Sequence, residues 1–175
     1  FRILKRNRKE PIMGIFDKLF SSKSKEIPLV APLSGEVVSI REVSDPTFGQ
    51  EILGKGVAIR PTSNRVLAPC DGVIEMMFDT GHAVSLTSDT GAEILIHIGL
   101  ETVTLKGKHF TIHAKNGERV RTGQLLIEFD REALIAEGFD IITPMVICNS
   151  DAFHTITPYI NKTVSAGELV LGLEK

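Results

Sequence analysis

The chain has 175 residues, of which 42% are hydrophobic and 24% are charged, and its formal net charge is −2. This length and composition suit one globular domain with a hydrophobic core and a short tail. The near-neutral charge gives no support for nucleic-acid binding, which usually requires a basic excess.

The apolar runs and the cysteines argue against a membrane-spanning protein and against a secreted disulfide-rich protein. The longest apolar runs, such as residues 94–98, are far too short to span a bilayer. The two cysteines, Cys70 and Cys148, are too few for a secreted disulfide scaffold, and no signal-peptide pattern is present. We therefore expect a cytoplasmic protein.

Residues 1–26 differ from the rest of the chain and predict a separate tail. Its first ten residues are basic, and several apolar residues are spaced to lie on one helical face. These are Ile12, Ile15, Phe16, Leu19 and Phe20. Such a helix can rest weakly on an anionic membrane. The alternative is a frayed tail that packs on the domain or is disordered, because so short a helix rarely holds alone in water.

Residues 27–175 have a pattern typical of β-structure. Short runs rich in Val and Ile are divided by Gly, Pro, Asn and Asp. The predicted strands are 27–30, 35–40, 56–61, 65–68, 72–78, 82–87, 93–98, 102–105, 125–129, 145–148 and 168–173. One short helix is predicted at 131–137. The fold class is therefore all-β, an antiparallel sandwich or barrel with minor short helices.

Two internal echoes predict similar halves built from repeated hairpins. The segment APLSGEVVSI at 31–40 recurs as APCDGVIEMM at 68–77. The segment NGERVRTGQLL at 116–126 recurs more weakly as INKTVSAGELV at 160–170. The shared pattern V-x-x-G-x-x-L/V suits a turn that delivers a strand, because glycine supplies the positive φ.

Two of the five histidines are predicted to meet. His82 opens the segment HAVSLTS, His97 ends AEILIH, and the turn signal Ser-Asp-Thr-Gly at 88–91 lies between them. A loop made of the two central turn residues places His82 directly opposite His97, with Cβ atoms roughly 4.5–5.5 Å apart. It also places Val84 opposite Leu95. A slip of one residue would send one imidazole to the far face of the sheet.

An opposed histidine pair suits phosphoryl transfer. One imidazole nitrogen can attack phosphorus, while the second ring stabilises the phosphoryl oxygens without a metal. Two alternatives stay open on spacing alone. The pair can be purely structural, or it can bind zinc if at least one more ligand is supplied. We expect His109, His113 and His154 to be surface residues.

The motifs TGHAVSL and GAEILIHIGLETVTLKGKHF, taken together, resemble the glucose-type enzyme IIA proteins of the bacterial phosphoenolpyruvate:sugar phosphotransferase system. Further matching stretches are APLSGEVVSI, DPTFGQEILGKGVAIRPT, VLAPCDGVI, NGERVRTGQLLIEFD and TPMVICN. They cover nearly all of residues 28–149. The segment MGIFDKLF, which begins at Met13, is similar to the amphipathic start of free-standing members.

This resemblance implies a fold, a reaction and roles for named residues. The fold would be a β-sandwich with a duplicated hybrid motif. His97 would accept a phosphoryl group at Nε2 from the phosphohistidine of HPr and pass it to a cysteine of an enzyme IIB domain. His82 would stabilise the phosphoryl group, Thr80 would hydrogen-bond within that network, and the carbonyl of Gly99 would fix the reacting ring.

The resemblance also implies partner contacts. The positions that correspond to the family's docking rim are Phe48, Ile52, Leu53, Phe78, Leu95 and Glu101. Some members have Phe and Asp at the last two, which concerns rim shape and partner preference. No cofactor is required, although in some members the two histidines, here His82 and His97, bind zinc with a partner's carboxylate. The phosphorylation state can also regulate permeases or kinases.

Three rival classes share features with this sequence. Zinc endopeptidases of the lysostaphin type share the architecture but need His-x-His, whereas this chain has Leu95 before Ile96 and His97. A biotinyl or lipoyl carrier needs a lysine at a hairpin tip, and the nearest segment, Glu75-Met76-Met77, has none. A purely regulatory protein that signals through phosphorylation is compatible with the main prediction.

Overall fold

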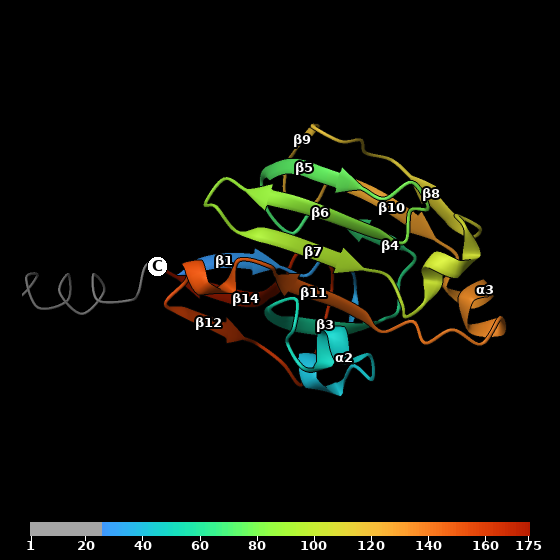
Figure 1. Cartoon of the computed structure of the whole chain (residues 1–175), viewed down its shortest axis with the longest axis horizontal. Helices are drawn as coiled ribbons and strands as arrows, with labels where there is room; N and C mark the ends of the chain where they lie inside the picture. The colour runs from blue at the N-terminus through green and yellow to red at the C-terminus, as the bar shows by residue number, and fades with distance from the viewer. Residues whose placement is uncertain (1–25) are drawn as a thin grey trace, which may run out of the picture.

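Antiparallel strands dominate the part of the chain that the structure describes, residues 26–175 of a computed structural model (Figure 1). The amphipathic helix predicted within residues 12–20 lies outside the described residues. Within 26–175, no helix has the length and apolar character needed to cross a membrane. The predicted all-β fold class is confirmed.

Residues 26–175 contain fourteen short strands, which are separated by turns rich in glycine. The strands are β1 (Ile27–Val30), β2 (Gly35–Ser39), β3 (Lys55–Pro61), β4 (Arg65–Leu67), β5 (Gly72–Met77), β6 (Ala83–Ser88), β7 (Glu93–His97), β8 (Phe110–Ile112), β9 (Arg119–Val120), β10 (Leu125–Phe129), β11 (Thr143–Ile147), β12 (Thr155–Pro158), β13 (Lys162–Val164) and β14 (Leu169–Glu174). The short helices are η1 (Ile40–Glu42), α2 (Pro46–Gly49), η2 (Thr102–Leu105), α3 (Arg131–Ala136) and η3 (Ser150–Ala152).

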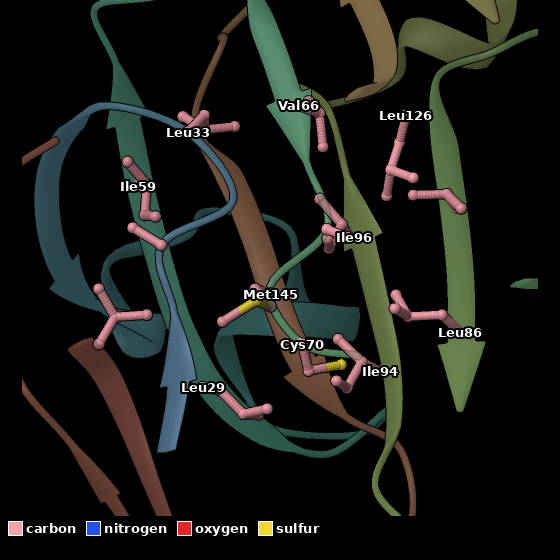
Figure 2. Packing of buried hydrophobic residues seen from close by; sticks show 14 of the residues in the cluster. Leu29, Leu33, Ile59, Val66, Cys70, Leu86, Ile94, Ile96, Leu126 and Met145 are labelled. Atoms are coloured by element: carbon pink, nitrogen blue, oxygen red, sulfur yellow. The ribbon is translucent and has the colours of Figure 1, made fainter. Parts of the chain in front are cut away.

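The strands form one large sheet and two small ones. The eight-stranded sheet has the order β13-β2-β3-β11-β7-β6-β5-β9, and the small sheets have the orders β1-β14-β12 and β4-β10-β8. The main core joins residues from the large sheet with residues from both small sheets (Figure 2). Fully buried members include Leu29, Ile59, Val66, Ile96 and Leu126. Removing these side chains from water is the main driving force for this sandwich.

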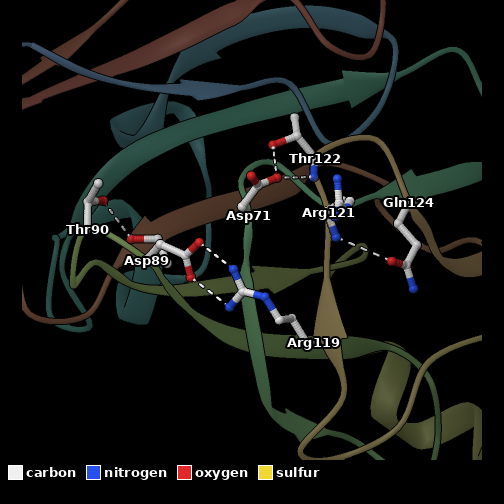
Figure 3. Close-up of polar contacts among 8 residues, drawn as sticks. Asp71, Asp89, Thr90, Arg119, Arg121, Thr122 and Gln124 are labelled. Atoms are coloured by element: carbon white, nitrogen blue, oxygen red, sulfur yellow. Dashed lines mark hydrogen bonds and ion pairs between the residues drawn. The ribbon is translucent and has the colours of Figure 1, made fainter.

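The prediction that the fold consists of two similar halves is confirmed, because the two ends of the large sheet contain turns of the same kind. At one end β2 pairs with β13, and at the other β5 pairs with β9. The Ser34 hydroxyl accepts a hydrogen bond from the Ala166 amide at 3.0 Å. In the other half, the Asp71 carboxylate accepts one from the Thr122 amide at 2.8 Å (Figure 3). The repeated sequence segments therefore form the same kind of turn in both halves.

The β6–β7 hairpin corrects the predicted register. Ala83, and not His82, pairs with His97. The loop contains the three residues 89–91, because the Ser88 amide donates to the Ala92 carbonyl at 2.8 Å. The glycine that ends the loop has φ 91°, which suits a three-residue hairpin loop. The prediction of a two-residue loop was therefore wrong by one position.

This shift changes what faces each residue of the hairpin. Ser85, rather than Val84, lies opposite Leu95. The Ile98 amide donates to the His82 carbonyl at 2.7 Å, so His82 lies beside Ile98. His82 itself precedes β6 and occupies a bend. Strand alternation therefore does not decide which way its ring points.

Two further segments differ from the prediction. Residues 102–105, predicted as a strand, form the 3-10 helix η2, because Glu101 at φ 60° and Lys106 at φ 52° turn the chain on both sides. Helix α2 was not predicted, although Asp45 caps it by accepting from the Thr47 amide at 2.9 Å and Pro46 opens it. Strands β8, β9, β12 and β13 were also missed.

Gly72, the first residue of β5, gives a stability prediction. A Cβ at Gly72 would lie 2.2 Å from the Thr87 carbonyl oxygen, so Gly72→Ala forces the β5–β6 pair apart. We expect a loss of about 3 kcal/mol in the free energy of unfolding, measured by urea denaturation. Gly123→Ala is the control, because Gly123 has φ 87° and a Cβ there would meet no atom within 4 Å, so strain alone costs about 1 kcal/mol. Equal losses in both variants would contradict the steric cause.

Candidate active site at the histidine pair

His97 ends β7 and faces away from the main core. Along β7, the partly buried Leu95 and His97 alternate with the fully buried Ile94 and Ile96. A second, smaller apolar cluster covers this outer face of the large sheet, and Leu95 packs against it. Its members are Val38, Ile40, Val43, Phe48, Ala58, Leu100, Ile142 and Val146. The candidate site therefore lies next to a compact apolar floor.

The ring of His97 has one nitrogen engaged. Its Nδ1 lies 2.7 Å from the carbonyl oxygen of Gly99. A carbonyl can only accept, so Nδ1 carries the proton and Nε2 keeps its lone pair. Gly99 has φ 68°, and a Cβ there would lie 2.9 Å from both the Asp140 carbonyl oxygen and Thr102 Cγ2. Only glycine fits this position, which ties the tautomer of His97 to the backbone.

The ring of His82 lies beside that of His97 despite the shifted register. The two ring centroids are 5.1 Å apart, and the rings meet edge to face at 80°. The turn before β6 makes this contact: the Gly81 amide donates to the Phe78 carbonyl at 2.8 Å, and Gly81 has φ 69°. The Thr80 hydroxyl lies 2.5 Å from His82 Nδ1. The predicted meeting of the two rings is confirmed, and its cause is a bend rather than direct strand pairing.

Two phenylalanine rings flank the pair. Phe48 of α2 lies 5.2 Å from the His97 ring, and Phe78 lies 5.4 Å from the His82 ring, both as centroid distances. Phe48 is only 4% exposed, so it packs as a wall on His97 rather than projecting into solvent. The successive contacts Phe48–His97–His82–Phe78 enclose the imidazoles in aromatic surroundings.

These surroundings keep both imidazoles neutral. Burial, followed by the neighbouring His97, lowers the pKa of His82 from 6.5 to about 4. Burial also lowers the pKa of His97, although the hydrogen bond to Gly99 and the carboxylate of Asp45 act in the opposite direction. A neutral imidazole retains the lone pair that a nucleophile needs, so each ring keeps one unprotonated nitrogen near neutral pH.

The other residues predicted to contact partners differ in exposure. Ile52 and Leu53 are 68% and 36% exposed, which is unusual for large apolar side chains. Phe78 and Leu95 are partly buried, and Glu101 is exposed. Ile52 and Leu53 lie in the connection between α2 and β3, and Glu101 directly precedes η2.

Sequence reasoning missed several residues near the site. Val103 is 49% exposed, and it was overlooked because its segment was predicted as a strand. A hollow of about 560 Å³ also lies beside the α2 segment and contains four carboxylate side chains. Its lining residues are Ser44, Asp45, Pro46, Leu100, Glu101, Glu137, Gly138, Phe139 and Asp140. The Asp-Pro pair at the start of α2 was the available sequence signal for Asp45.

The zinc prediction gains no support. Within residues 26–175, no group of three or more His, Cys, Asp or Glu side chains is placed to hold a metal. Nδ1 is engaged in both rings, by Thr80 in His82 and by Gly99 in His97. A metal bound through the two Nε2 atoms would therefore need ligands from outside this range.

The fold and the paired imidazoles together define a histidine-bearing carrier of the duplicated β-sandwich class. Residues 27–153 match the family model described as phosphoenolpyruvate-dependent sugar phosphotransferase system, EIIA 1. The chain therefore belongs to this family, and it is a phosphoryl-carrier component of a phosphotransferase system. The predicted family is confirmed, and the metalloprotein and biotinyl-carrier alternatives are not supported.

Individual relatives agree with this assignment. The chain is 43% identical over 166 residues to the "PTS system glucose-specific EIIA component" of Haemophilus influenzae, covering 93% of this chain and 100% of that protein. It is 47% identical over 138 residues to the "PTS system beta-glucoside-specific EIIBCA component" of Dickeya chrysanthemi, covering 79% of this chain and 22% of that protein. The solved glucose permease IIA from Mycoplasma capricolum superposes with a TM-score of 0.77 at 32% identity, covering 85% of this chain and 96% of that chain.

The low pKa of His82 predicts a pH-dependent stability. The unfolded chain protonates this residue near pH 6.5, whereas the folded protein does so only near pH 4. Its stabilising effect is therefore complete above about pH 6.5 and is lost as the pH falls toward 4. We expect the wild type to lose about 2 kcal/mol more than His82→Gln between pH 7 and pH 5, measured by urea denaturation. Parallel pH profiles for the two proteins would contradict the buried, neutral state of His82.

Proposed function

We propose that Nε2 of His97 accepts a phosphoryl group from the phosphohistidine of HPr and passes it to a cysteine of a sugar-specific enzyme IIB. The observation that carries this proposal is the 2.7 Å bond from His97 Nδ1 to the Gly99 carbonyl, which leaves Nε2 as the free lone pair. As the new N–P bond forms, the N–P bond of the donor breaks. The donor imidazole is a good leaving group, so transfer depends mainly on positioning and on charge stabilisation.

His82 is suited to stabilise the transferred group. The hydroxyl of Thr80 can donate to Nδ1 of His82, which leaves the proton on Nε2 of that ring. Because the ring lies 5.1 Å from that of His97, this N–H can reach an oxygen of a phosphoryl group on the neighbouring ring. In this proposal His82 is the stabilising group and Thr80 holds it in the required orientation.

The surroundings of His97 are suited to successive partners. Exposed Ile52, Leu53 and Val103 offer apolar contacts, and covering them excludes water from a labile N–P bond. The acidic hollow that contains Asp45 and Glu101 suits basic side chains of a phosphoryl donor. We assign the predicted docking rim to this surface, with Phe48, Phe78 and Leu95 supporting it from below.

The wider biological role follows from these partners. The glucose-specific relatives favour a glucose-type system, with sugar selection made by the membrane permease that receives the phosphoryl group. The protein would act in the cytoplasm as a single carrier domain over residues 27–175. We further propose that the phosphorylation state of the protein regulates permeases or kinases. We also propose that residues 1–26 make weak contact with the membrane.

Removal of His97 tests the phosphoryl acceptor. We expect His97→Ala to take up no label from radiolabelled phosphoenolpyruvate in the presence of enzyme I and HPr, because the Nε2 lone pair that the Gly99 contact leaves free is removed. The wild-type label should be acid-labile and base-stable, as expected of phosphohistidine. His154→Ala is the control, since it removes an exposed histidine outside the site. A His97→Ala protein that still incorporates label would end the assignment.

Removal of His82 separates acceptance from transfer. We expect His82→Ala to be labelled by phosphorylated HPr at a rate within about tenfold of wild type, because the nucleophile and its Gly99 contact remain. Onward transfer to enzyme IIB should fall by about a hundredfold or more, since the developing charge loses its stabilising donor. Rapid-quench measurements of both half-reactions provide the test. Equal effects on the two steps would contradict the division of roles.

A further inference from the structure

Thr102 is buried beside the site although its side chain is polar. It is 0% exposed, and its hydroxyl donates to the Ile98 carbonyl at 2.6 Å. Its methyl group, Cγ2, packs against Gly99. A Cβ added to Gly99 would lie only 2.9 Å from this methyl group. One side chain therefore holds both residues that follow His97, by a hydrogen bond to the first and by packing against the second.

The backbone held by Thr102 joins the two histidines. The amide of Ile98 donates to the carbonyl of His82 at 2.7 Å, while its carbonyl accepts from Thr102. The next carbonyl, that of Gly99, accepts the Nδ1–H of His97. Both polar groups of Ile98 are thus fixed, one by the neighbouring histidine and one by the threonine hydroxyl.

The peptide that links Gly99 to Leu100 is fixed from its far side. The Leu100 amide donates to the Asp140 carbonyl at 2.9 Å. Asp140 is in turn ordered by its side chain, which accepts from the Ile142 amide at 3.0 Å. With the Leu100 end of this turn held by Asp140, the Ile98 end is held by the His82 carbonyl and the Thr102 hydroxyl together.

We propose that Thr102 is a positioning residue that holds the Gly99 carbonyl on Nδ1 of His97, and that it thereby selects the tautomer with a free Nε2. This inference rests on the proposed function of His97 as the phosphoryl acceptor. Without the hydroxyl, the buried Ile98 carbonyl loses its partner and the peptides that follow it turn toward another donor. The Gly99 carbonyl then moves, the proton redistributes to Nε2, and the nucleophilic lone pair is lost from that atom.

Thr102→Val provides the direct test, because valine keeps the methyl contact and removes the hydroxyl. Nitrogen NMR of the unphosphorylated protein should show a smaller share of the Nδ1–H tautomer of His97 than in wild type. The maximal rate of labelling by phosphorylated HPr should fall by about ten- to a hundredfold, with KM for HPr unchanged because the docking surface is intact. A wild-type tautomer and a wild-type rate would overturn the proposal.

Ser88→Ala is the matched control. Ser88 is also buried, at 5% exposure, and its hydroxyl accepts a hydrogen bond from the Ala92 amide at 2.9 Å. It lies at the loop of the β6–β7 hairpin, whereas His97 lies at the other end of β7. This variant also loses a buried hydroxyl hydrogen bond and should leave the tautomer and the labelling rate as in wild type. If Ser88→Ala changes the His97 spectrum as much as Thr102→Val does, the effect is general loosening and the proposal fails.

A second pair of variants covers the case in which valine prevents folding. Thr102→Ser keeps the hydroxyl and should retain the wild-type tautomer, whereas Thr102→Ala should lose it. Loss of the tautomer in Thr102→Ser would overturn the role of the hydroxyl. The NMR measurement needs no phosphoryl transfer, so it still tests Thr102 if wild type fails to accept label, which would refute the proposed function alone.

Discussion

The hydrogen bond between His97 Nδ1 and the carbonyl of Gly99 is the contact on which the chemistry of this site depends. A neutral imidazole can carry its proton on either nitrogen, and only the unprotonated nitrogen can attack phosphorus. A backbone carbonyl settles this choice because it never donates. Its position is set by a left-handed glycine packed between Thr102 and the Asp140 backbone, which leaves no room for a side chain. The nitrogen that keeps its lone pair is thus determined by backbone geometry, because a backbone carbonyl orients the imidazole.

The two similar halves of the fold contribute unequally to the site. Strands β11 and β7 lie side by side at the centre of the large sheet, where the two halves of the fold meet. Met145 of β11 pairs with Ile96 of β7, and these two residues are equivalent in the two halves. The residue that follows Met145, Val146, therefore corresponds to His97, which follows Ile96. The connection between β2 and β3, residues 40–54, is longer than the one between β5 and β6. It folds over the face that carries Val146 and presents Phe48 to His97. One half therefore has no histidine at this position, and its longer connection supplies a wall for the candidate site in the other half.

The sequence predicted the fold class well, because period-2 alternation and repeated turn signals are local patterns. It also predicted that the two histidines meet, but through a hairpin register that is wrong. The signal at residues 88–91 is compatible with loops of two or three residues, and only pairing along the whole hairpin decides between them. The bend at His82 then restores the contact. Residues 102–105 alternate like a strand, yet left-handed residues on both sides override that pattern. The role inferred for Thr102 arises from packing alone, which no spacing in the sequence reveals.

The degree of burial of the two histidines affects both the protonation of their rings and the access of a partner to Nε2. Protonation would remove the nucleophilic lone pair from His97 and place two like charges side by side, and the apolar surroundings disfavour both outcomes. Complete burial would also prevent a partner from reaching Nε2. The structure avoids this by burying His82 to 5% exposure while His97 stays partly accessible at the sheet end. Under the proposed function, the less exposed ring serves as a fixed, neutral neighbour, and the more exposed ring exchanges the phosphoryl group. This division of exposure explains why two histidines of similar chemistry are suited to different tasks.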